Sequence, residues 1–422
     1  MDKLVVRGGA RLSGTVAISG AKNAVLPAMA AAILTAGKTE LENVPRLRDV
    51  ATMTRLLRHL GAVVTETKGN RLMIDAAGVN KPEAPYDLVR TMRASFEVLG
   101  PLLARFGTAR VSLPGGCAIG ARPINLHLTG LAAMGAEIDL RDGYVEAKAR
   151  GLMGASILLD VASVGATRNL MMAATLAKGT TVINNAAQEP EVTDLAKLLS
   201  AMGARISGAG SGTIRIDGVK QLGGARHKTI PDRIEAGSYL AASVLTGGGL
   251  AVKGAVREHL ASFESRLALA GVTLEEGPSG LYPKMAVSRL KSSDAVTAPY
   301  PGFATDMQAQ WTALMTLADG TAVIRETLFE NRFQHVPEMV RMGADITVKG
   351  ATAVVRGVPG LKGAPVMVSD LRAGIALVIA ALAAEGTTEI YRIYHLDRGY
   401  EKLVEKLSAV GASIERVPGP AI

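Results

Sequence analysis

The pattern of hydrophobic and polar positions repeats about every 70 residues along the chain. A short word, an apolar residue followed by glycine and a small residue, recurs six times, with its glycine at positions 61, 135, 203, 271, 343 and 411. The spacings between these glycines are 74, 68, 68, 72 and 68 residues. Self-similarity at a fixed period is typical of folds built from repeated units. The sequence therefore predicts six copies of one supersecondary unit.

Each copy contains the same order of predicted elements. An apolar helix rich in alanine and glycine comes first, as at 24–37, and a strand follows it, as at 39–44, 180–185 and 387–392. An amphipathic helix such as 192–202 comes next, and the repeated glycine ends that helix before a further strand. This alternation predicts the α/β or α+β class, with the small residues of the first helices packed closely inside the fold.

Six units in 422 residues suggest two domains of three units each. The basic, glycine-containing stretch 221–230 is the expected boundary between them. The strand expected at 4–7 precedes the first repeat, so it could pair with either domain.

Composition narrows the class of protein. Hydrophobic residues make up 48% and charged residues 20%, which is typical of a soluble globular protein. A single cysteine and the absence of an apolar signal core predict a cytoplasmic protein, and the apolar runs are too short to span a bilayer. The net charge of +9 favours an anionic partner, and small phosphorylated ligands suit it better than nucleic acid because aromatic residues are only 4%. The six histidines lack metal-ligand spacing, so no metal is expected.

The stretch 112–123, S-L-P-G-G-C-A-I-G-A-R-P, is predicted to be an exposed, movable loop that carries the single cysteine, Cys117. Three glycines free its backbone, and prolines flank it. Arg122 lies five residues beyond the thiol, and a nearby cation lowers a thiol pKa. The alternative is a small buried hydrophobic residue, but the flanking sequence has no apolar period. A reactive thiol is therefore the preferred interpretation.

Polar and charged residues recur at the start of each predicted first helix, where unpaired N–H groups suit anions. The six groups are Lys22 and Asn23; Arg93; 163–167; Asp232, Arg233 and Glu235; Asp306 and Gln308; and Asp370 and Arg372. A helix dipole disfavours cations at this end, so their repeated presence indicates function. Ser163, Asp306 and Asp370 could instead be ordinary N-caps; that alternative stays open for Asp370 and is rejected for Lys22.

Together these residues resemble one family, the UDP-N-acetylglucosamine 1-carboxyvinyltransferases, over essentially the whole chain. The matching pieces are S-G-A-K-N, Y-D-L-V-R-T-M-R-A-S, S-L-P-G-G-C-A-I-G-A-R-P-I-N-L, T-D-M-Q-A-Q, F-E-N-R-F and R-I-Y-H-L-D-R-G-Y-E. The resemblance implies a two-domain inside-out α/β barrel with three βαβαββ units per domain. One domain would span 22–229 and carry Cys117, and the other would combine 1–21 with 230–422.

The resemblance also implies the substrates, UDP-N-acetylglucosamine and phosphoenolpyruvate, with no cofactor, metal, nucleic acid, membrane insertion or obligate protein partner. Its implied catalytic residues are Cys117, Asp306, Lys22 and Arg398. The implied phosphoenolpyruvate ligands are Lys22, Asn23, Arg122 and Arg398, with Arg332 and Arg372 on the carboxylate. The implied sugar-nucleotide ligands are Asn23, Arg93, Arg122, Pro123, Ile124, Asn125, Leu126, Ser163, Val164, Gly165, Asp306 and Leu328.

The implied reaction is addition followed by elimination, in which Asp306 stabilises positive charge at C2 of the enol. Cys117 could donate a proton to C3 or attack C2, and the residues do not choose between these roles. At two positions the chain departs from some family members: Val161 and Arg48 stand where those members have lysine. These differences are expected to change substrate affinity rather than the bond-making step. The competing interpretations are the related synthase acting on shikimate 3-phosphate, which lacks the cysteine loop, and a non-catalytic sugar-nucleotide binder, which has no need of the thiol.

Overall fold

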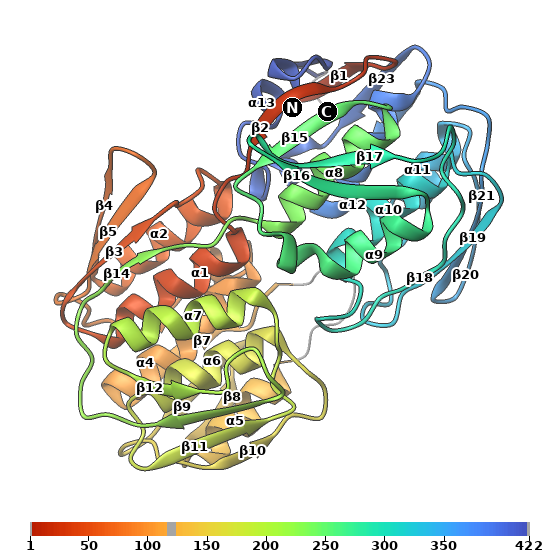
Figure 1. Ribbon diagram of the computed structural model, residues 1–422. Coiled ribbons are helices and arrows are strands. Elements are labelled where there is room, and N and C mark those ends of the chain that lie inside the picture. The colour runs from red at the N-terminus through yellow and green to blue at the C-terminus, as the bar shows by residue number, and fades with distance from the viewer. Residues whose placement is uncertain (1, 116–123, 420–422) are drawn as a thin grey trace. The chain divides into compact units, whose positions relative to one another are not determined.

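The computed structural model describes residues 2–115 and 124–419. Its chain divides into two compact units, named here by their place in the sequence. The central unit comprises the described residues between 20 and 230, and the terminal unit comprises 2–19 and 231–419. Figure 1 shows both units, with many of their helices and strands labelled.

Each unit contains three four-stranded sheets that share one plan. A short edge strand runs parallel to its neighbour, and the two remaining pairings are antiparallel, as in the order β10-β11-β13-β12. In the central unit the sheets are β14 (Arg226–Lys228), β3 (Lys38–Glu42), β5 (Arg71–Asp75), β4 (Val63–Thr67); β6 (Glu83–Ala84), β7 (Thr108–Ser112), β9 (Tyr144–Lys148), β8 (Glu137–Arg141); and β10 (Ser156–Leu158), β11 (Thr180–Asn184), β13 (Thr213–Asp217), β12 (Arg205–Ser207). In the terminal unit they are β2 (Ser13–Ala17), β15 (Gly249–Lys253), β17 (Gly280–Met285), β16 (Val272–Gly277); β18 (Ala295–Val296), β19 (Thr321–Arg325), β21 (Thr352–Arg356), β20 (Asp345–Lys349); and β22 (Pro365–Met367), β23 (Thr387–Tyr391), β1 (Asp2–Arg7), β24 (Ser413–Pro418).

The helices of each unit follow the predicted alternation of enclosed and amphipathic members. The central unit has α1 (Lys22–Ala31), η1 (Ala32–Leu34), α2 (Arg48–Leu60), α3 (Tyr86–Val89), η2 (Arg93–Val98), α4 (Leu99–Phe106), α5 (Asn125–Ala133), α6 (Val164–Ala174) and α7 (Pro190–Ala201). The terminal unit has α8 (Arg233–Leu245), η3 (Arg257–Leu260), α9 (Ala261–Leu269), η4 (Thr305–Met307), α10 (Gln308–Met315), α11 (Val336–Arg341), α12 (Leu371–Ala383), η5 (Ile393–Arg398) and α13 (Leu403–Ala409). None of the helices in the described ranges is long and apolar enough to cross a membrane.

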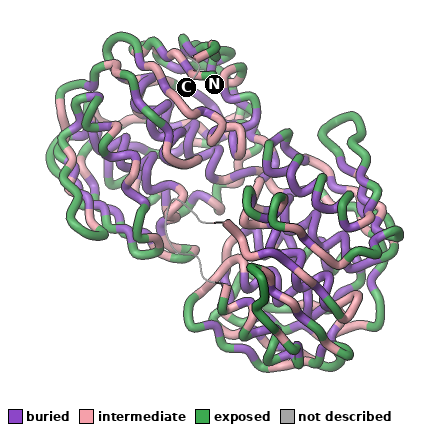
Figure 2. Tube along the Cα trace, turned by 180° about the vertical axis from the view of Figure 1, so that it is seen from behind, coloured by how far each residue is buried: buried purple, intermediate pink, exposed green. Residues whose placement is uncertain are grey.

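Two core clusters, one in each unit, are built around the first helices of the repeats. In α10 every residue is buried, in α6 all but the first two are, and in α12 all but the first and the last are. The strands instead alternate exposed and buried residues, as in β13. The first helices of the repeats therefore lie inside each unit and the sheets lie outside, which confirms the predicted inside-out α/β arrangement (Figure 2).

The six repeated glycines end the amphipathic helices, as predicted. All six have a positive φ, between 87° and 108°. Their amide groups cap the preceding turn, as where Gly203 N–H donates to the carbonyl oxygen of Ser200 at 2.9 Å. A left-handed backbone at this position favours glycine because a Cβ would be strained there.

The predicted strand ends need correction. The strands expected to reach 44, 185 and 392 stop earlier, because Asn43, Asn185 and Arg392 take a left-handed backbone with φ of 54–58°. The chain passes from the central to the terminal unit between 230 and 231, at the end of the stretch 221–230, and strand β14 within that stretch pairs with β3. The first strand, left open between domains, pairs with β23 and β24 of the terminal unit.

Replacing a repeated glycine should cost stability for backbone reasons alone. At Gly343, φ is +92° and an added Cβ would meet nothing within 4 Å, so Gly343→Ala isolates the left-handed penalty, about 1 kcal/mol of unfolding free energy. Gly360→Ala is the matched control, because its surroundings are equally open and its φ is not in the left-handed region. Denaturant unfolding should show a loss for the first variant only. Equal stability of the two variants would contradict the capping role.

Candidate active site

In the central unit, the predicted ligands gather at helix starts. Lys22 and Asn23 open α1, and Arg93 opens η2. Asn125 and Leu126 open α5, and Ser163 caps α6 by accepting a hydrogen bond from Ala166 N–H at 3.3 Å. The cap interpretation is therefore correct for Ser163, although Val164 and Gly165 follow it in the first turn. Cys117, Arg122 and Pro123 lie outside the described residues.

Lys22 is held by a carboxylate that the sequence analysis did not single out. Its Nζ lies 3.1 Å from Oδ2 of Asp49, and the two side chains are only 14% and 4% exposed. Asp49 lies in the first turn of α2, where a carboxylate also suits the helix dipole. Because the ammonium is paired and the side chain is mostly buried, it is oriented at the start of α1. This supports a binding role and argues further against a capping interpretation of Lys22.

A second buried polar cluster joins four of these helix starts. Arg168 of α6 forms an ion pair with Glu97 of η2 and donates from Nη1 to the carbonyl oxygen of Asn23 at 2.6 Å. Asn169 accepts from Gly100 N–H at 2.8 Å through Oδ1, so its Nδ2 group donates to Nδ1 of His127 at 3.0 Å.

The charged state of this cluster follows from its burial. Burial, with the positive charges of Arg93 and Arg168, lowers the pKa of His127 to about 3. Burial raises the pKa of Glu97, and the charges of Arg168 and Arg93 oppose that rise. His127 is therefore neutral at pH 7, with its proton on Nε2.

In the terminal unit, Asp306 lies between two buried guanidinium groups. Its Oδ1 is 2.5 Å from Nη2 of Arg332, and its Oδ2 is 2.8 Å from Nη2 of Arg372. The arginine side chains are 4% and 5% exposed, whereas Asp306 is 27% exposed. Asp306 is not an N-cap, since Ala304 precedes η4 with no side-chain cap. The structure thus brings together three residues that the resemblance linked to the substrates.

A hydrogen-bond network holds one arginine of this pair, Arg372, in place. Arg372 Nη1 donates to the Tyr400 hydroxyl at 3.3 Å, and that hydroxyl lies 2.9 Å from Oγ of Ser238. Burial by itself would lower the pKa of Arg372, but Asp306 and Tyr400 raise it above its ordinary value. The guanidinium therefore stays charged. Asp370 caps α12 by accepting from the amides of Arg372 and Ala373, so the question left open for Asp370 is settled as a cap.

The other predicted ligands of the terminal unit are more exposed. Arg398 is the last residue of η5 and is half-buried. Leu328 is 38% exposed, and its amide donates to Oε1 of Glu326 at 2.8 Å. The two departures from the family pattern lie at the surface: Arg48 opens α2, and Val161 is 61% exposed. Neither contributes to the buried clusters.

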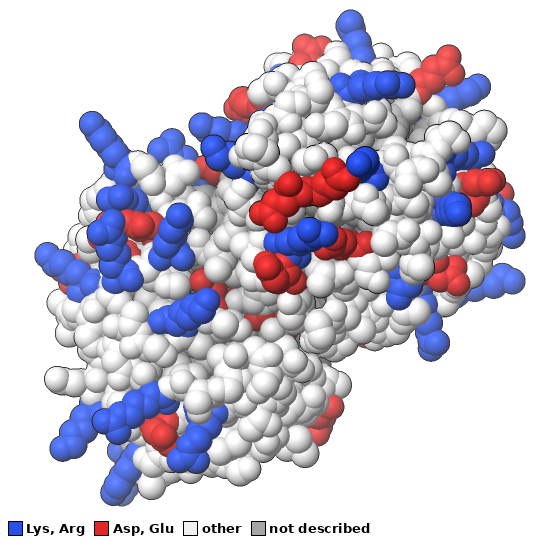
Figure 3. All heavy atoms as spheres, viewed as in Figure 1, with Lys and Arg blue, Asp and Glu red and all other residues white. Residues whose placement is uncertain are grey.

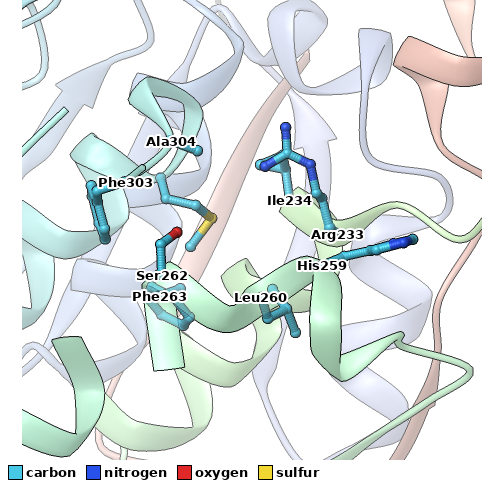
Figure 4. Close-up of a pocket in the computed structure, with 9 residues that line it drawn as sticks. Arg233, Ile234, His259, Leu260, Ser262, Phe263, Phe303 and Ala304 are labelled. Atoms are coloured by element: carbon cyan, nitrogen blue, oxygen red, sulfur yellow. The ribbon is translucent and has the colours of Figure 1, made fainter. Parts of the chain in front are cut away.

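A small pocket lies beside the start of α8, where Arg233 and His259 face Phe303 and Ala304 across it (Figure 4). Its volume of about 10 Å³ is room for one water molecule, so it is no substrate site. Arg233 instead lies over the ring of Tyr300, with its Cζ 5.6 Å from the centroid. No group of three or more His, Cys, Asp or Glu side chains in the described residues could hold a metal ion.

The net positive charge is concentrated in the central unit. Residues 20–230 contain 25 Lys and Arg but 17 Asp and Glu, which accounts for nearly all of the net +9. Figure 3 shows one face, on which basic side chains outnumber acidic ones over the strands and helices of this unit. Such a surface raises the local concentration of anions.

Comparison with known proteins identifies the class. Residues 6–407 match the family model described as EPSP synthase (3-phosphoshikimate 1-carboxyvinyltransferase). The enolpyruvyl transferase NikO from Streptomyces tendae has a TM-score of 0.90 and 29% identity, covering 99% of both chains. An EPSP synthase from Acinetobacter baumannii, with a TM-score of 0.75 and 17% identity over 99% of this chain and 100% of that one, shares the fold. The protein is a transferase of the EPSP synthase family.

Similar curated proteins narrow the family further. UDP-N-acetylglucosamine 1-carboxyvinyltransferase of Geotalea daltonii is 57% identical over 417 residues, covering 99% of this chain and 100% of the relative. The same-named protein of Granulibacter bethesdensis is 55% identical over 424 residues, with the same coverage. The chain belongs to the UDP-N-acetylglucosamine 1-carboxyvinyltransferase family, which confirms the resemblance found in the sequence.

The lowered pKa of His127 predicts the direction in which the free energy of unfolding changes with pH. A neutral buried histidine contributes stability that is present above pH 6.5 and is lost as pH falls toward its folded pKa of about 3. His127→Gln keeps an acceptor for Asn169 but cannot titrate. Between pH 7 and pH 5 the parent should lose roughly 2 kcal/mol more unfolding free energy than this variant. The exposed His59→Gln is the control, and identical pH dependence in parent and His127→Gln would refute the assignment.

Proposed function

We propose that this protein transfers the enolpyruvyl group of phosphoenolpyruvate to the 3-hydroxyl of UDP-N-acetylglucosamine and releases phosphate. In this proposal the reaction is the first committed step of peptidoglycan synthesis, and it takes place in the cytoplasm. Peptidoglycan synthesis in turn serves cell-wall growth, cell shape and cell division. The observation that carries the proposal is the bracketing of Asp306 by Arg332 and Arg372. Family membership supports the same reaction, since the relatives are named for it.

The arginine pair suits the carboxylate of phosphoenolpyruvate. Two guanidinium groups that are nearly fully buried bind a carboxylate far more strongly than exposed ones do. Asp306 now supplies that carboxylate from within the chain. An arriving substrate carboxylate competes for both arginines, and Asp306 is then free to turn toward the reacting hydroxyl. Substrate binding would thus release the catalytic group from its resting ion pairs.

The phosphate and the sugar nucleotide would be bound by the remaining predicted residues. Lys22, Arg122 and Arg398 are proposed to hold the phosphate, because cations at oriented positions stabilise the leaving group as its charge develops. The helix starts of the central unit are proposed to hold UDP-N-acetylglucosamine through Asn23, Arg93, Arg122, Pro123, Ile124, Asn125, Leu126, Ser163, Val164 and Gly165, with Asp306 and Leu328 from the terminal unit. The excess positive charge of residues 20–230 suits a diphosphate.

The proposed chemistry adds the sugar hydroxyl across the enol and then eliminates phosphate. The 3-oxygen forms a bond to C2 while C3 gains a proton, giving a tetrahedral ketal; loss of phosphate from C2 and of a proton from C3 restores the double bond. Asp306 stabilises positive charge at C2 and accepts the hydroxyl proton. Its positioning beside the reacting hydroxyl must carry much of the effect, because a carboxylate is a weak base. Cys117 is proposed to deliver the proton to C3 or to attack C2.

Release of inorganic phosphate from phosphoenolpyruvate tests the function directly. It should require UDP-N-acetylglucosamine, and shikimate 3-phosphate should not replace it. Release with shikimate 3-phosphate alone would favour the related synthase, and binding of the sugar nucleotide without any turnover would favour a non-catalytic binder.

Asp306→Asn should lower turnover by roughly 10²-fold or more while substrate binding stays largely intact, because the amide keeps the size but loses the charge and the basicity. Steady-state phosphate release and calorimetric binding together measure this. Asp345→Asn is the matched control, since Asp345 forms only an exposed ion pair with Arg356. Turnover within a few-fold of the parent would make Asp306 a structural residue.

The thiol of Cys117 should take up one molecule of the epoxide fosfomycin, whose phosphonate resembles the phosphate of the substrate. If Lys22, Arg122 and Arg398 bind the phosphonate, the strained ring is held where thiolate attack opens it. Intact-protein mass spectrometry should show one adduct on the parent and none on Cys117→Ala. Cys117→Asp should resist the compound yet keep activity, because a carboxylic acid can donate a proton. An adduct that survives Cys117→Ala would defeat the assignment.

A further inference from the structure

Arg168 has no role in the proposed chemistry, yet its side chain is nearly fully buried among the helices of the central unit. Its side chain is 9% exposed and that of Glu97 is 6% exposed. A buried ion pair is a costly way to stabilise a fold, since apolar residues of the same volume often do as well. Such a pair in the middle of an apolar core therefore needs a reason beyond stability.

The second guanidinium contact supplies that reason. Arg168 Nη1 donates to the carbonyl oxygen of Asn23 at 2.6 Å, while Nη2 faces Glu97. Asn23 belongs to the first turn of α1, Glu97 to η2 and Arg168 to the second turn of α6. One planar group with fixed fork geometry thus links the starts of three helices that carry proposed sugar-nucleotide ligands.

The fourth helix start is joined through the neighbouring residue. Asn169 donates to His127, which lies one residue beyond the proposed ligands at 125–126. A Cβ added at Gly165 would lie 3.3 Å from the His127 ring and 3.9 Å from Oε1 of Glu97, so this helix start packs directly on the cluster.

We infer that Arg168 is a positioning residue for the sugar-nucleotide site: by holding the Asn23 carbonyl and the Glu97 carboxylate together, it sets the spacing of the helix starts that bind UDP-N-acetylglucosamine. This inference rests on the proposed function. Arg168 does not touch the substrate; it acts through Asn23 and Arg93, which lie on the elements that it ties.

The experiment separates positioning from stability by comparing affinity with the melting temperature. Arg168→Met should weaken UDP-N-acetylglucosamine binding about tenfold, as expected for loss of one charge-assisted hydrogen bond, and should also lower Tm because Glu97 is left buried and unpaired. The Michaelis constant for the sugar nucleotide should rise by a similar factor while kcat falls less than about threefold. Calorimetry on the full chain gives the dissociation constant.

The double variant Glu97→Leu/Arg168→Met decides between the two roles. Replacing both charges by apolar groups should return Tm toward the parent value, but affinity should stay about tenfold weaker because nothing holds the Asn23 carbonyl. Arg168→Lys should give intermediate affinity, since one ammonium cannot serve both partners with the same geometry. Asp194→Asn is the matched control: it breaks a buried pair with His227 in the same unit, so it should lower Tm and leave affinity unchanged.

Recovery of affinity along with Tm in the double variant, or unchanged affinity in Arg168→Met, would overturn the inference and leave the proposed function standing. If the double variant does not fold, Arg168→Lys with affinity equal to that of the parent overturns it instead. Failure of the parent itself to bind UDP-N-acetylglucosamine would overturn the proposed function and, with it, the role of Arg168.

Discussion

The enclosure of the first helix of each repeat determines where this protein can do chemistry. Helices such as α6 and α12 are surrounded by other helices and sheets along nearly their whole length, so their sides offer no surface to a ligand. Their N-terminal turns are the exception, because the backbone N–H groups there need partners and a loop must enter. The proposed ligands Lys22, Arg93 and Arg372 accordingly lie at helix starts, whereas Arg332 and Arg398 reach the proposed site from outside such a start.

Charges placed at such positions must be oriented before a substrate arrives. In the terminal unit Asp306 orients Arg332 and Arg372, and in the central unit Asp49 orients Lys22. Each cation is paired with a carboxylate of its own unit, so the cost of burying it is already offset. In the proposed mechanism, a substrate carboxylate would replace that of Asp306 between the arginines without a rearrangement of the helices. The same principle extends to Arg168, whose partners are one carboxylate and one main-chain carbonyl.

The sequence predicted the repeats well because their signals are local. The glycine that follows each amphipathic helix and the small residues of the enclosed helices are readable from neighbouring positions, and the six helix starts lie where they were expected. The errors came from backbone states that propensity does not reveal, such as the left-handed Asn43 and Asn185 that shorten two strands. Strand β14 was not predicted within the boundary stretch, because its partner β3 is nearly two hundred residues away.

Side-chain pairing was the larger omission in the predicted site. Glu97 and Arg168 are 71 residues apart, and Asn23 and Arg168 are 145 apart. No spacing rule connects such positions. The signal available in the sequence was that Glu97 and Arg168 are each a charged residue within a largely apolar helical stretch. The ion pairs of Asp306 were likewise invisible, so that a capping role for it could be weighed from sequence and was dismissed only by geometry.

The position of β1 has a consequence for how the protein is made. The described residues of the central unit all lie between 20 and 230, so this unit can begin to fold before synthesis of the chain is complete. The terminal unit cannot, because β1 is an inner strand of its last sheet and pairs with β23 and β24, where Leu4 lies opposite Ile390 and Arg416. The backbone hydrogen-bonding groups of β1 therefore lack their strand partners until almost the entire polypeptide has been synthesised. A translation product that ends after 230 but before β24 would therefore contain the whole sequence of the central unit and would leave β1 unpaired along at least one edge.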